Sequence, residues 1–490
     1  MTSTNEQRVL DMVPKGLLIG GQWRESSDGK SLDVIDPATG TVLTSIADAS
    51  ESDGLDAIAA AHEAQAEWAA TAPRYRAELL RSAFERVNEL ADDFAFLMSL
   101  EMGKPVAEAR GEVSYGNEFI RWFSEEAPRV TGRYGTAPDG KNRILVLKRP
   151  VGPSLFITPW NFPLAMATRK IGPAIATGCT MILKPAAQTP LTSLLLASVL
   201  QDLGLPPGVL NVIPTSRAGA VTGPIIKDGR LRKLSFTGST AVGQRLIRDS
   251  ADRVLRTSME LGGNAPLIVF DDANIDKAVE GALLAKLRNM GEACTAANRF
   301  IVHESVAEEF SRRVASRMSK LKMARGTVPD ANIGPLIDEP SRQAVHRLVE
   351  DAVAEGAKIM TGGQLPEGGG YFYPPTVLTN VSPDSDILHE EIFGPVAPVV
   401  TFTSEEEAIG LANATEYGLV AYAFTEDLNR GLRLAEKLEV GMLGLNTGLV
   451  SNPAAPFGGI KSSGLGREGG FEGIDEYLET VYVGIADPLA

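Results

Sequence analysis

The sequence predicts an α/β protein built from two doubly wound (Rossmann-like) domains, each a parallel sheet with covering helices. Short runs rich in Val, Ile and Leu alternate with longer amphipathic segments, and this alternation is typical of such sheets. The alternation restarts near 260–266, which predicts a domain boundary there. The length of 490 residues is sufficient, since domains hold roughly 100–200 residues each.

The elements expected before that boundary follow one another as strand and helix. Pro163 supports one of these helices, because proline is well tolerated in the first helical turn. In chain order we expect a strand at 154–158, a helix at 163–177, a strand at 180–184, a helix at 192–203, strands at 209–213 and 233–236, and a helix at 241–250.

The same pattern is repeated after the boundary. The apolar run 266–270 predicts a buried strand, and Asp271 or Asp272 can cap the helix that follows. Apolar residues at spacings of three and four predict that helix over 275–288. A strand at 299–303 and a helix at 306–321 continue the unit.

Two strand-like stretches fit neither unit. The runs 143–147 (RILVL) and 480–485 (TVYVGI) are far apart in sequence. They either pair as a small excursion used in subunit contacts or form edge strands of the main sheets. The sequence leaves both arrangements open.

Composition excludes several classes of protein. Two cysteines, Cys179 and Cys294, are too few for a disulfide framework or a Cys-rich zinc module. The 4 histidines show no metal-ligand spacing, so we expect no metal. A net charge of −15 argues against a nucleic-acid partner. Segment 1–9 lacks the apolar stretch of a secretory signal, and no apolar run could span a membrane. We therefore expect a cytoplasmic protein with no membrane partner.

Two motifs suit cofactor binding and proton transfer. In 236–243 (FTGSTAVG) a strand ends in a Gly-Ser turn that opens a helix, and the free N–H groups of a helix start suit a phosphate. Capping of the helix by Ser239 or Thr240 is the alternative. In 259–266 (MELGGNAP) Glu260 lies among apolar neighbours, which raise the pKa of a carboxyl and suit a general base. A surface Glu in a turn is the alternative.

Two further motifs suit covalent chemistry. Cys294 lies in a loop of small residues, 291–296 (GEACTA), and a thiolate is a strong nucleophile. An inert buried thiol is the alternative. Asn161, in 158–163 (TPWNFP), joins a strand to a helix, where its amide can donate to an oxyanion or simply cap the helix. The GxGxxG match that begins at Gly464 follows no strand, and we interpret it as a loop.

Together the motifs resemble the NAD(P)-dependent aldehyde dehydrogenase family, and most closely its succinate-semialdehyde-oxidising members. The match runs in order from about Leu17 to the C-terminus. The segments that carry it are TPWNFP (158–163), LKP (183–185), FTGSTAVG (236–243), MELGGNAP (259–266), GEACTAANR (291–299), EEIFGPV (390–396) and PFGGIKSSGLGRE (456–468).

The resemblance implies an aldehyde dehydrogenase-like fold and its division into parts. A cofactor-binding domain would comprise 1–130 and 151–259, and a catalytic domain 260–446. Residues 131–150 and 470–490 would form a small β oligomerisation element. A homodimer or homotetramer is therefore expected.

The resemblance also implies the chemistry. Cys294 would attack the aldehyde carbon to form a thiohemiacetal, and hydride transfer to the nicotinamide would leave a thioester. Glu260 would activate the water that hydrolyses it. The side chain of Asn161, with the backbone N–H of Cys294, would bind the oxyanion.

The cofactor implied by the family is NADP or NAD. NAD-preferring relatives often carry Glu where this chain has Ala187, and a carboxylate there would repel a 2′-phosphate. We therefore predict NADP, with NAD possible. The family's cofactor contacts fall on Thr158, Trp160, Lys184, Ala187, Gly238, Ser239, Leu261, Glu391 and Phe393.

The substrate implied by the subfamily is a small aldehyde that carries a carboxylate. Arg binds a carboxylate well because its planar fork donates two hydrogen bonds. The matching positions are Arg169, Arg288 and Ser451, with Phe162 and Phe457 as aromatic walls. The alternatives are an exposed helix Arg, an Arg paired with a structural Glu, and aromatic rings that belong to the core.

We predict oxidation of succinate semialdehyde to succinate. Glutarate semialdehyde is one methylene longer, and a binding site distinguishes one methylene by only about 1–3 kcal/mol. Oxidation of glutarate semialdehyde therefore stays an alternative. A broad-specificity aldehyde dehydrogenase is another. A coenzyme-A-acylating enzyme is disfavoured because such enzymes generally lack the Glu matched by Glu260.

Overall fold

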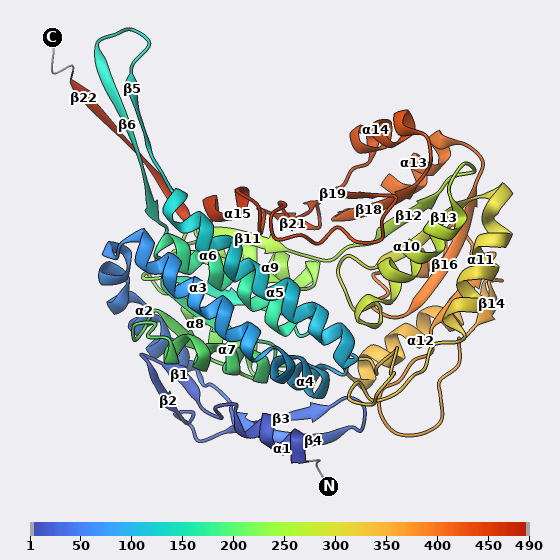
Figure 1. The fold of residues 1–490 in the computed structure, drawn as a ribbon, viewed down its shortest axis with the longest axis horizontal. Coiled ribbons are helices and arrows are strands. Elements are labelled where there is room, and N and C mark those ends of the chain that lie inside the picture. Colours follow the sequence, from blue (N-terminus) through green and yellow to red (C-terminus); the bar gives the residue numbers. More distant parts are fainter. Residues whose placement is uncertain (1–3, 487–490) are drawn as a thin grey trace.

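A computed structural model describes residues 4–486 of the chain. Two sheets, each covered by helices, lie side by side, and a three-stranded arm projects away from the first (Figure 1). The chain passes from the first sheet to the second over 261–264. No helix in 4–486 is both long and apolar enough to cross a membrane.

The first sheet has eight strands in the order β2-β1-β9-β8-β7-β10-β11-β21. The central run from β9 to β11 is parallel, while β2, β1 and β21 join it antiparallel. The bounds are β1 Leu17–Ile19, β2 Gln22–Arg24, β7 Ser154–Ile157, β8 Met181–Lys184, β9 Leu210–Val212, β10 Lys233–Thr237, β11 Arg256–Glu260 and β21 Gly464–Leu465.

The second sheet has seven strands in the order β14-β15-β16-β13-β12-β18-β19. All neighbours are parallel except β14 and β15. The bounds are β12 Ala265–Val269, β13 Ala297–His303, β14 Lys358–Thr361, β15 Thr376–Thr379, β16 Val396–Phe402, β18 Val420–Phe424 and β19 Met442–Leu445. The predicted α/β class with two parallel sheets is confirmed.

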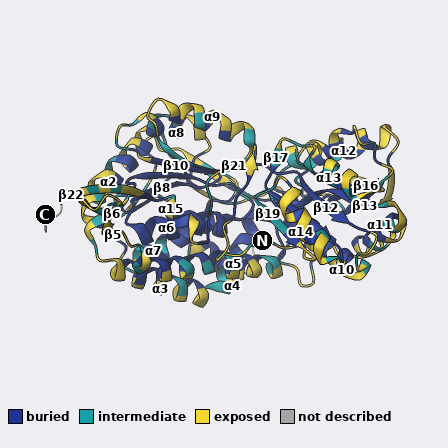
Figure 2. Cartoon of the chain, turned by 90° about the horizontal axis from the view of Figure 1, so that it is seen from above, coloured by how far each residue is buried: buried dark blue, intermediate teal, exposed yellow. Residues whose placement is uncertain are grey.

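Helices cover both faces of each sheet, so the strands are buried between them (Figure 2). The first-sheet helices are α2 Glu51–Ala70, α3 Pro73–Glu89, α4 Ala91–Met102, α5 Val106–Glu126, α6 Pro163–Thr177, α7 Leu191–Asp202, α8 Ala218–Lys227 and α9 Thr240–Ala251. The second-sheet helices are α10 Ile275–Leu287, α11 Glu304–Met318, α12 Glu339–Ala354, α13 Glu405–Asn413 and α14 Leu428–Lys437. The remaining elements are α1 Thr4–Asp11, α15 Glu472–Asp475, and the pairs β3 Ser31–Asp36 with β4 Thr41–Ala47 and β17 Tyr417–Gly418 with β20 Ile460–Lys461.

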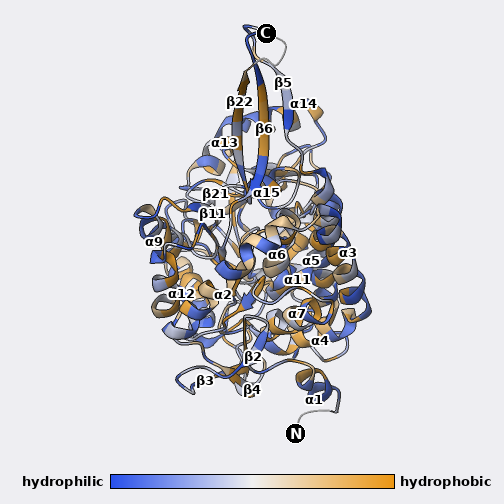
Figure 3. Ribbon diagram, turned by 90° about the vertical axis from the view of Figure 1, so that its left-hand side faces the viewer, coloured by the Kyte–Doolittle hydropathy of each residue, from blue (hydrophilic) through white to orange (hydrophobic). Residues whose placement is uncertain are grey.

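The arm consists of β5 (Arg133–Thr136), β6 (Asn142–Pro150) and β22 (Leu478–Ala486). The two lone stretches pair with each other, antiparallel, with Leu145 opposite Val483. The predicted pairing is thus confirmed. The alternative prediction, that these stretches form edge strands of the main sheets, is wrong. Parts of β6 and β22 are coloured as hydrophobic residues in the ribbon of Figure 3. Residues 487–490 of the expected 470–490 segment, and 1–3 of the expected 1–130 segment, lie outside the described residues.

Two local predictions around α10 are wrong. Asn274, rather than Asp271 or Asp272, caps this helix by accepting from the Lys277 N–H. Asp272 instead accepts from the Thr425 hydroxyl, a partner far along the chain that sequence spacing could not reveal. The helix also ends at Leu287, one residue early, because the backbone then turns through left-handed φ values.

Candidate active site

Cys294 lies in a tight loop between α10 and β13. The backbone before it turns sharply, with φ values of 56° at Asn289, 56° at Met290 and 80° at Gly291. A Cβ atom at Gly291 would lie 2.2 Å from the Gly394 carbonyl oxygen, so only glycine permits this close approach. The loop therefore holds the cysteine against the segment that carries Glu391 and Phe393.

Asn161 is buried in the loop that joins β7 to α6, beside the cysteine loop. Its Oδ1 accepts from the Phe162 N–H at 3.1 Å, and its Nδ2 donates to the Glu292 carbonyl at 3.0 Å. Lys104 Nζ and Asn289 Nδ2 both donate to the Asn161 carbonyl, at 2.8 and 3.0 Å. An amide NH₂ has two hydrogens, so the oriented side chain keeps one donor for a ligand.

Glu260 ends β11 and is buried. Burial raises the pKa of its carboxyl well above the usual value, and the neighbouring Glu468 raises it further, while Arg169 and Lys170 oppose the shift. Its Oε2 is buried without a hydrogen-bond partner among residues 4–486. A buried carboxyl with a raised pKa and a free oxygen suits proton transfer near neutral pH.

The Cys294 thiol is partly buried and free. Burial raises its pKa to about 12, the charge of Arg169 lowers it, and Glu391 and Glu260 raise it. The thiol therefore needs a nearby proton acceptor to become a nucleophile. Cys179 is fully buried, and its Sγ is 3.4 Å from the Tyr477 carbonyl, as expected for a structural thiol.

A cavity of about 230 Å³ surrounds the thiol. It brings together the predicted catalytic residues and most of the predicted cofactor contacts. The rings of Trp160 and Phe393, which both line it, contact each other edge to face, with centroids 5.5 Å apart. The lining residues are Pro159, Trp160, Asn161, Met166, Thr237, Gly238, Ser239, Glu260, Leu261, Gly262, Cys294, Glu391 and Phe393.

Three predicted cofactor contacts, Thr158, Lys184 and Ala187, do not line this cavity. The Thr158 N–H donates to the Lys184 carbonyl at 3.2 Å, between the ends of β7 and β8. Lys184 is buried, which lowers the pKa of its ammonium group to about 8, and it forms no ion pair within residues 4–486. Ala187 is half-buried just beyond it.

The start of α9 has the features of a phosphate site. Ser239 occupies the cap position but its side chain makes no capping hydrogen bond, and the Thr240 hydroxyl donates to the Ser462 carbonyl at 3.2 Å. Capping by Ser239 is therefore wrong. The first N–H groups of the helix remain available for an anion.

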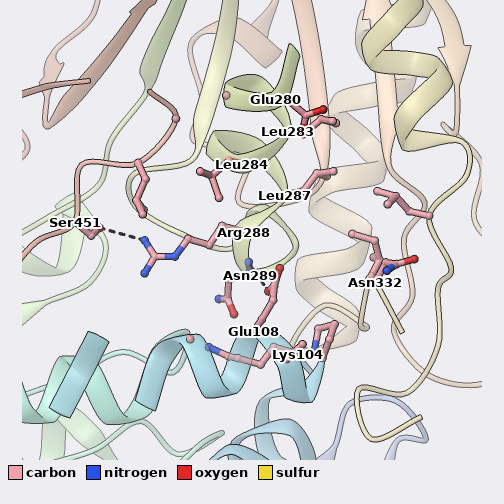
Figure 4. A pocket seen from close by; sticks show the side chains of 18 of the residues that line it. Lys104, Glu108, Glu280, Leu283, Leu284, Leu287, Arg288, Asn289, Asn332 and Ser451 are labelled. Carbon is pink, nitrogen blue, oxygen red and sulfur yellow. Dashed lines mark hydrogen bonds between the residues drawn. The ribbon is translucent and has the colours of Figure 1, made fainter. Parts of the chain in front are cut away.

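A second cavity, of about 1110 Å³, lies beside the first. Asn161 lines the smaller cavity and Phe162 lines the larger one. Arg288 extends from the end of α10 into the larger cavity and donates from Nη1 to the Ser451 hydroxyl at 3.1 Å (Figure 4). The guanidinium carbon is 4.9 Å from the centre of the Phe162 ring.

The two arginines expected to bind a carboxylate are placed differently. Arg169 is buried on α6, its Nε is 2.7 Å from Glu468 Oε2, and it lines neither cavity. Its guanidinium carbon is 3.9 Å from the centre of the Phe457 ring, which is buried as well. Pairing with a structural Glu, the alternative left open for either Arg, is what the structure shows for Arg169. Its Nη2 still has no partner among residues 4–486.

Sequence reasoning missed the wall that α5 contributes to the larger cavity. Glu108, Glu112 and Tyr115 line it, and their spacing of four and three residues places them on one helical face. That spacing is the only sequence signal, and it is equally typical of a core-facing stripe. The Glu108 carboxylate accepts from the Asn289 N–H at 2.8 Å, and Glu112 pairs with Lys104.

Known proteins resemble this chain over nearly its whole length. The model of the aldehyde dehydrogenase family matches residues 23–483. A succinate-semialdehyde dehydrogenase of Paenarthrobacter nicotinovorans is 62% identical over 447 residues, covering 91% of this chain and 99% of that protein. A glutarate-semialdehyde dehydrogenase of Pseudomonas putida is 47% identical over 470 residues, covering 96% of this chain and 97% of that protein. The crystal structure of an Escherichia coli NADP-dependent enzyme has a TM-score of 0.96 at 46% identity, covering 97% of this chain and 99% of that one.

Proposed function

The chain belongs to the aldehyde dehydrogenase family of oxidoreductases, and on this premise we propose that it oxidises succinate semialdehyde to succinate with NADP, or with NAD. The observation that carries the choice of substrate is the Arg288–Ser451 pair, which lines the cavity next to the one that holds Cys294. The likeness to the Paenarthrobacter enzyme supports it.

The catalytic steps follow from the groups around the thiol. Glu260, with its free Oε2, accepts the thiol proton, and Sγ of Cys294 attacks the aldehyde carbon. The oxygen of the resulting thiohemiacetal develops negative charge, which the remaining Asn161 amide hydrogen and the Cys294 N–H stabilise. Glu260 passes the thiol proton on to solvent before hydrolysis. After oxidation to the thioester, Glu260 takes a proton from water, and the resulting hydroxide attacks the thioester carbon. The tetrahedral adduct then expels the Cys294 thiolate, which takes the proton from Glu260. Succinate leaves and the thiol is restored.

The residues present fit a nicotinamide dinucleotide. The free start of α9, Gly238 and Ser239 suit the pyrophosphate, and Lys184 suits a ribose hydroxyl or a 2′-phosphate. Trp160, Leu261, Glu391 and Phe393, which line the cavity around Cys294, would surround the nicotinamide end. When bound, the dinucleotide supplies the acceptor for the hydride from the aldehyde carbon. Ala187 leaves no carboxylate that would repel a 2′-phosphate.

We place the substrate carboxylate on Arg288 and Ser451. Arg288 forms no ion pair within residues 4–486, although its charge lowers the pKa of nearby Glu108, so its guanidinium can still bind a ligand carboxylate. Arg169 pairs with Glu468 and lines neither cavity, so its contribution is its positive charge, which lowers the pKa of Cys294. Phe162 and Phe457 support the two guanidinium groups through ring contacts.

Glutarate semialdehyde stays a second candidate. The cavity of about 1110 Å³ has room for one more methylene, and the glutarate-semialdehyde dehydrogenase of Pseudomonas putida is 47% identical to this chain.

We further propose that 1–130 and 151–259 bind the cofactor, that 260–446 carry the nucleophile, and that 131–150 with 470–490 form a subunit contact in a homodimer or homotetramer. The arm supports this contact, since Tyr134 and Tyr482 on it are 64% and 65% exposed. A reducing, cytoplasmic location suits a reaction that needs Cys294 as a thiol.

The test compares succinate semialdehyde, glutarate semialdehyde and butanal in wild type and Arg288→Ala, with NADP and with NAD. We expect kcat/KM for the acidic aldehydes to fall about 10- to 150-fold in the variant, as expected for a charged hydrogen bond, with butanal unchanged. Arg317→Ala is the matched control, because Arg317 lines the same cavity but pairs with Glu280 at its exposed rim. Equal wild-type rates on butanal, unaffected by Arg288→Ala, would contradict the proposal.

A further inference from the structure

We propose that Tyr115 is a further specificity-determining residue, whose hydroxyl donates a hydrogen bond to the substrate carboxylate beside Arg288 and Ser451. The inference rests on the proposed function and deepens it, because it adds a donor to the carboxylate site. No sequence motif pointed to this residue.

Tyr115 stands between the nucleophile loop and the Arg288–Ser451 pair. It projects from α5 and lines the larger cavity together with Phe162, Arg288 and Ser451. Its ring packs against the small apolar cluster that includes Ala293 and Ala296, the neighbours of Cys294. A carboxylate that reaches Arg288 from an aldehyde at Cys294 therefore passes the Tyr115 ring.

The Tyr115 hydroxyl has no hydrogen bond of regular geometry within the described part of the chain. The oxygen is buried, and the Ser451 hydroxyl lies near enough for a weak hydrogen-bond interaction that lowers the pKa of the phenol. A buried hydroxyl left unsatisfied is costly, and native structures retain one mainly where a ligand or water completes it. An unpartnered donor that lines a cavity points to a ligand with an acceptor.

Positive charge surrounds this hydroxyl. The Arg288 guanidinium carbon is 5.4 Å from the centre of the Tyr115 ring, and the charges of Arg169 and Arg288 both lower the pKa of the phenol, while burial keeps it above its ordinary value. Tyr115 therefore stays protonated at neutral pH, and the nearby cations make its O–H a better donor.

Arg288, Ser451 and Tyr115 together offer more donor hydrogens than the Ser451 oxygen can accept. Arg288 offers N–H groups, Ser451 accepts from Arg288 and keeps its own O–H, and Tyr115 adds a third group. The nearest carboxylates on this wall are already engaged, Glu108 by the Asn289 N–H and Glu112 by Lys104. A carboxylate has two oxygens with about four lone-pair sites, so it can satisfy all three donors together.

The experiment measures steady-state kinetics of Tyr115→Phe with succinate semialdehyde and with butanal, its uncharged four-carbon counterpart, at saturating NADP. We expect KM for succinate semialdehyde, and the inhibition constant of the product succinate, to rise about tenfold. Butanal kinetics should stay within twofold, which also shows that the variant is folded. Tyr373→Phe is the control, because it removes another buried phenol hydroxyl from a residue that lines neither cavity.

Two outcomes would overturn this inference. One is an unchanged KM for succinate semialdehyde in Tyr115→Phe, and the other is an equal loss with butanal, which would make Tyr115 a structural residue. Both are separable from failure of the proposed function. If wild type favours succinate semialdehyde and Arg288→Ala abolishes that preference, the substrate class stands whatever Tyr115→Phe does.

Discussion

The cavity that holds Cys294 and the cavity that holds Arg288 are built in different ways. The smaller one is lined by short loops at strand ends, where neighbours in sequence act together, as in Pro159–Asn161, Thr237–Ser239 and Glu260–Gly262. The larger one draws the polar groups assigned to the substrate from distant elements, with Tyr115 on α5, Arg288 after α10 and Ser451 in a late loop.

The residues assigned to catalysis and those assigned to substrate choice therefore lie in differently built parts of the molecule. The thiol, the base and the oxyanion donor share a compact frame of backbone turns, which few substitutions could alter without disturbing the others. The substrate wall depends on individual side chains that can change singly. Variants in the smaller cavity should therefore lose turnover of every aldehyde. Variants in the larger cavity should lose the preference among aldehydes.

The largest expected effect lies on the thiol side. Cys294→Ser should reduce turnover of every aldehyde by about 10³-fold or more, because loss of a nucleophile removes the covalent route. NADP binding, followed by fluorescence titration, should change less than about twofold. Residual turnover within tenfold of wild type would remove Cys294 from the proposed mechanism.

The pH dependence of Cys294 alkylation is the next largest effect. Burial raises the pKa of this thiol to about 12, so its thiolate fraction grows tenfold with each pH unit below that value. Iodoacetamide should therefore modify Cys294 about a hundredfold faster at pH 9 than at pH 7. Mass spectrometry of the two cysteine peptides measures this, with buried Cys179 as the internal control. A rate that levels off near pH 8 would contradict the raised pKa.

The two arginines sharpen the comparison further. Arg169→Met removes one partner of buried Glu468, which keeps Lys170, and should cost about 3 kcal/mol of folding free energy. Arg288→Met should change stability by less than about 0.5 kcal/mol and instead raise KM for the acidic aldehyde. Thermal unfolding of both variants tests this. An equal decrease in Tm for the two variants would contradict the assignment of Arg169 as structural and Arg288 as substrate-facing.

The smallest expected effect concerns the choice of dinucleotide. Lys184→Ala should raise KM for NADP about tenfold, as for one charge-assisted contact, and KM for NAD less than threefold. Lys227→Ala, at the exposed end of α8, is the control. Initial rates with both dinucleotides measure the ratio. Equal increases for NADP and NAD would show that Lys184 does not distinguish a 2′-phosphate.

Much of the fold was predictable because its signals are local. The helix at 163–177 was predicted with its observed bounds, since Pro163 begins it and Gly178, at a φ of 87°, ends it. The strands β7, β8, β10 and β12 were predicted within one residue at each end, because buried parallel strands are short apolar runs bounded by turns. The cap of α10 was missed because Asn274 competed with two aspartates that a distant loop engages.

The sequence by itself determined the two-sheet α/β class and the motifs that place Cys294, Glu260 and Asn161 at element ends, because each depends on residues adjacent in the chain. Only the tertiary structure decided which arginine is free. Glu468 lies 299 positions after Arg169 in the sequence, yet folding buries the two charges together, since an unpaired buried charge is costly. The role proposed for Tyr115 depends on tertiary structure in the same way, because α5 approaches the turn after α10, where Glu108 accepts from the Asn289 N–H, and this brings the Tyr115 ring beside Arg288.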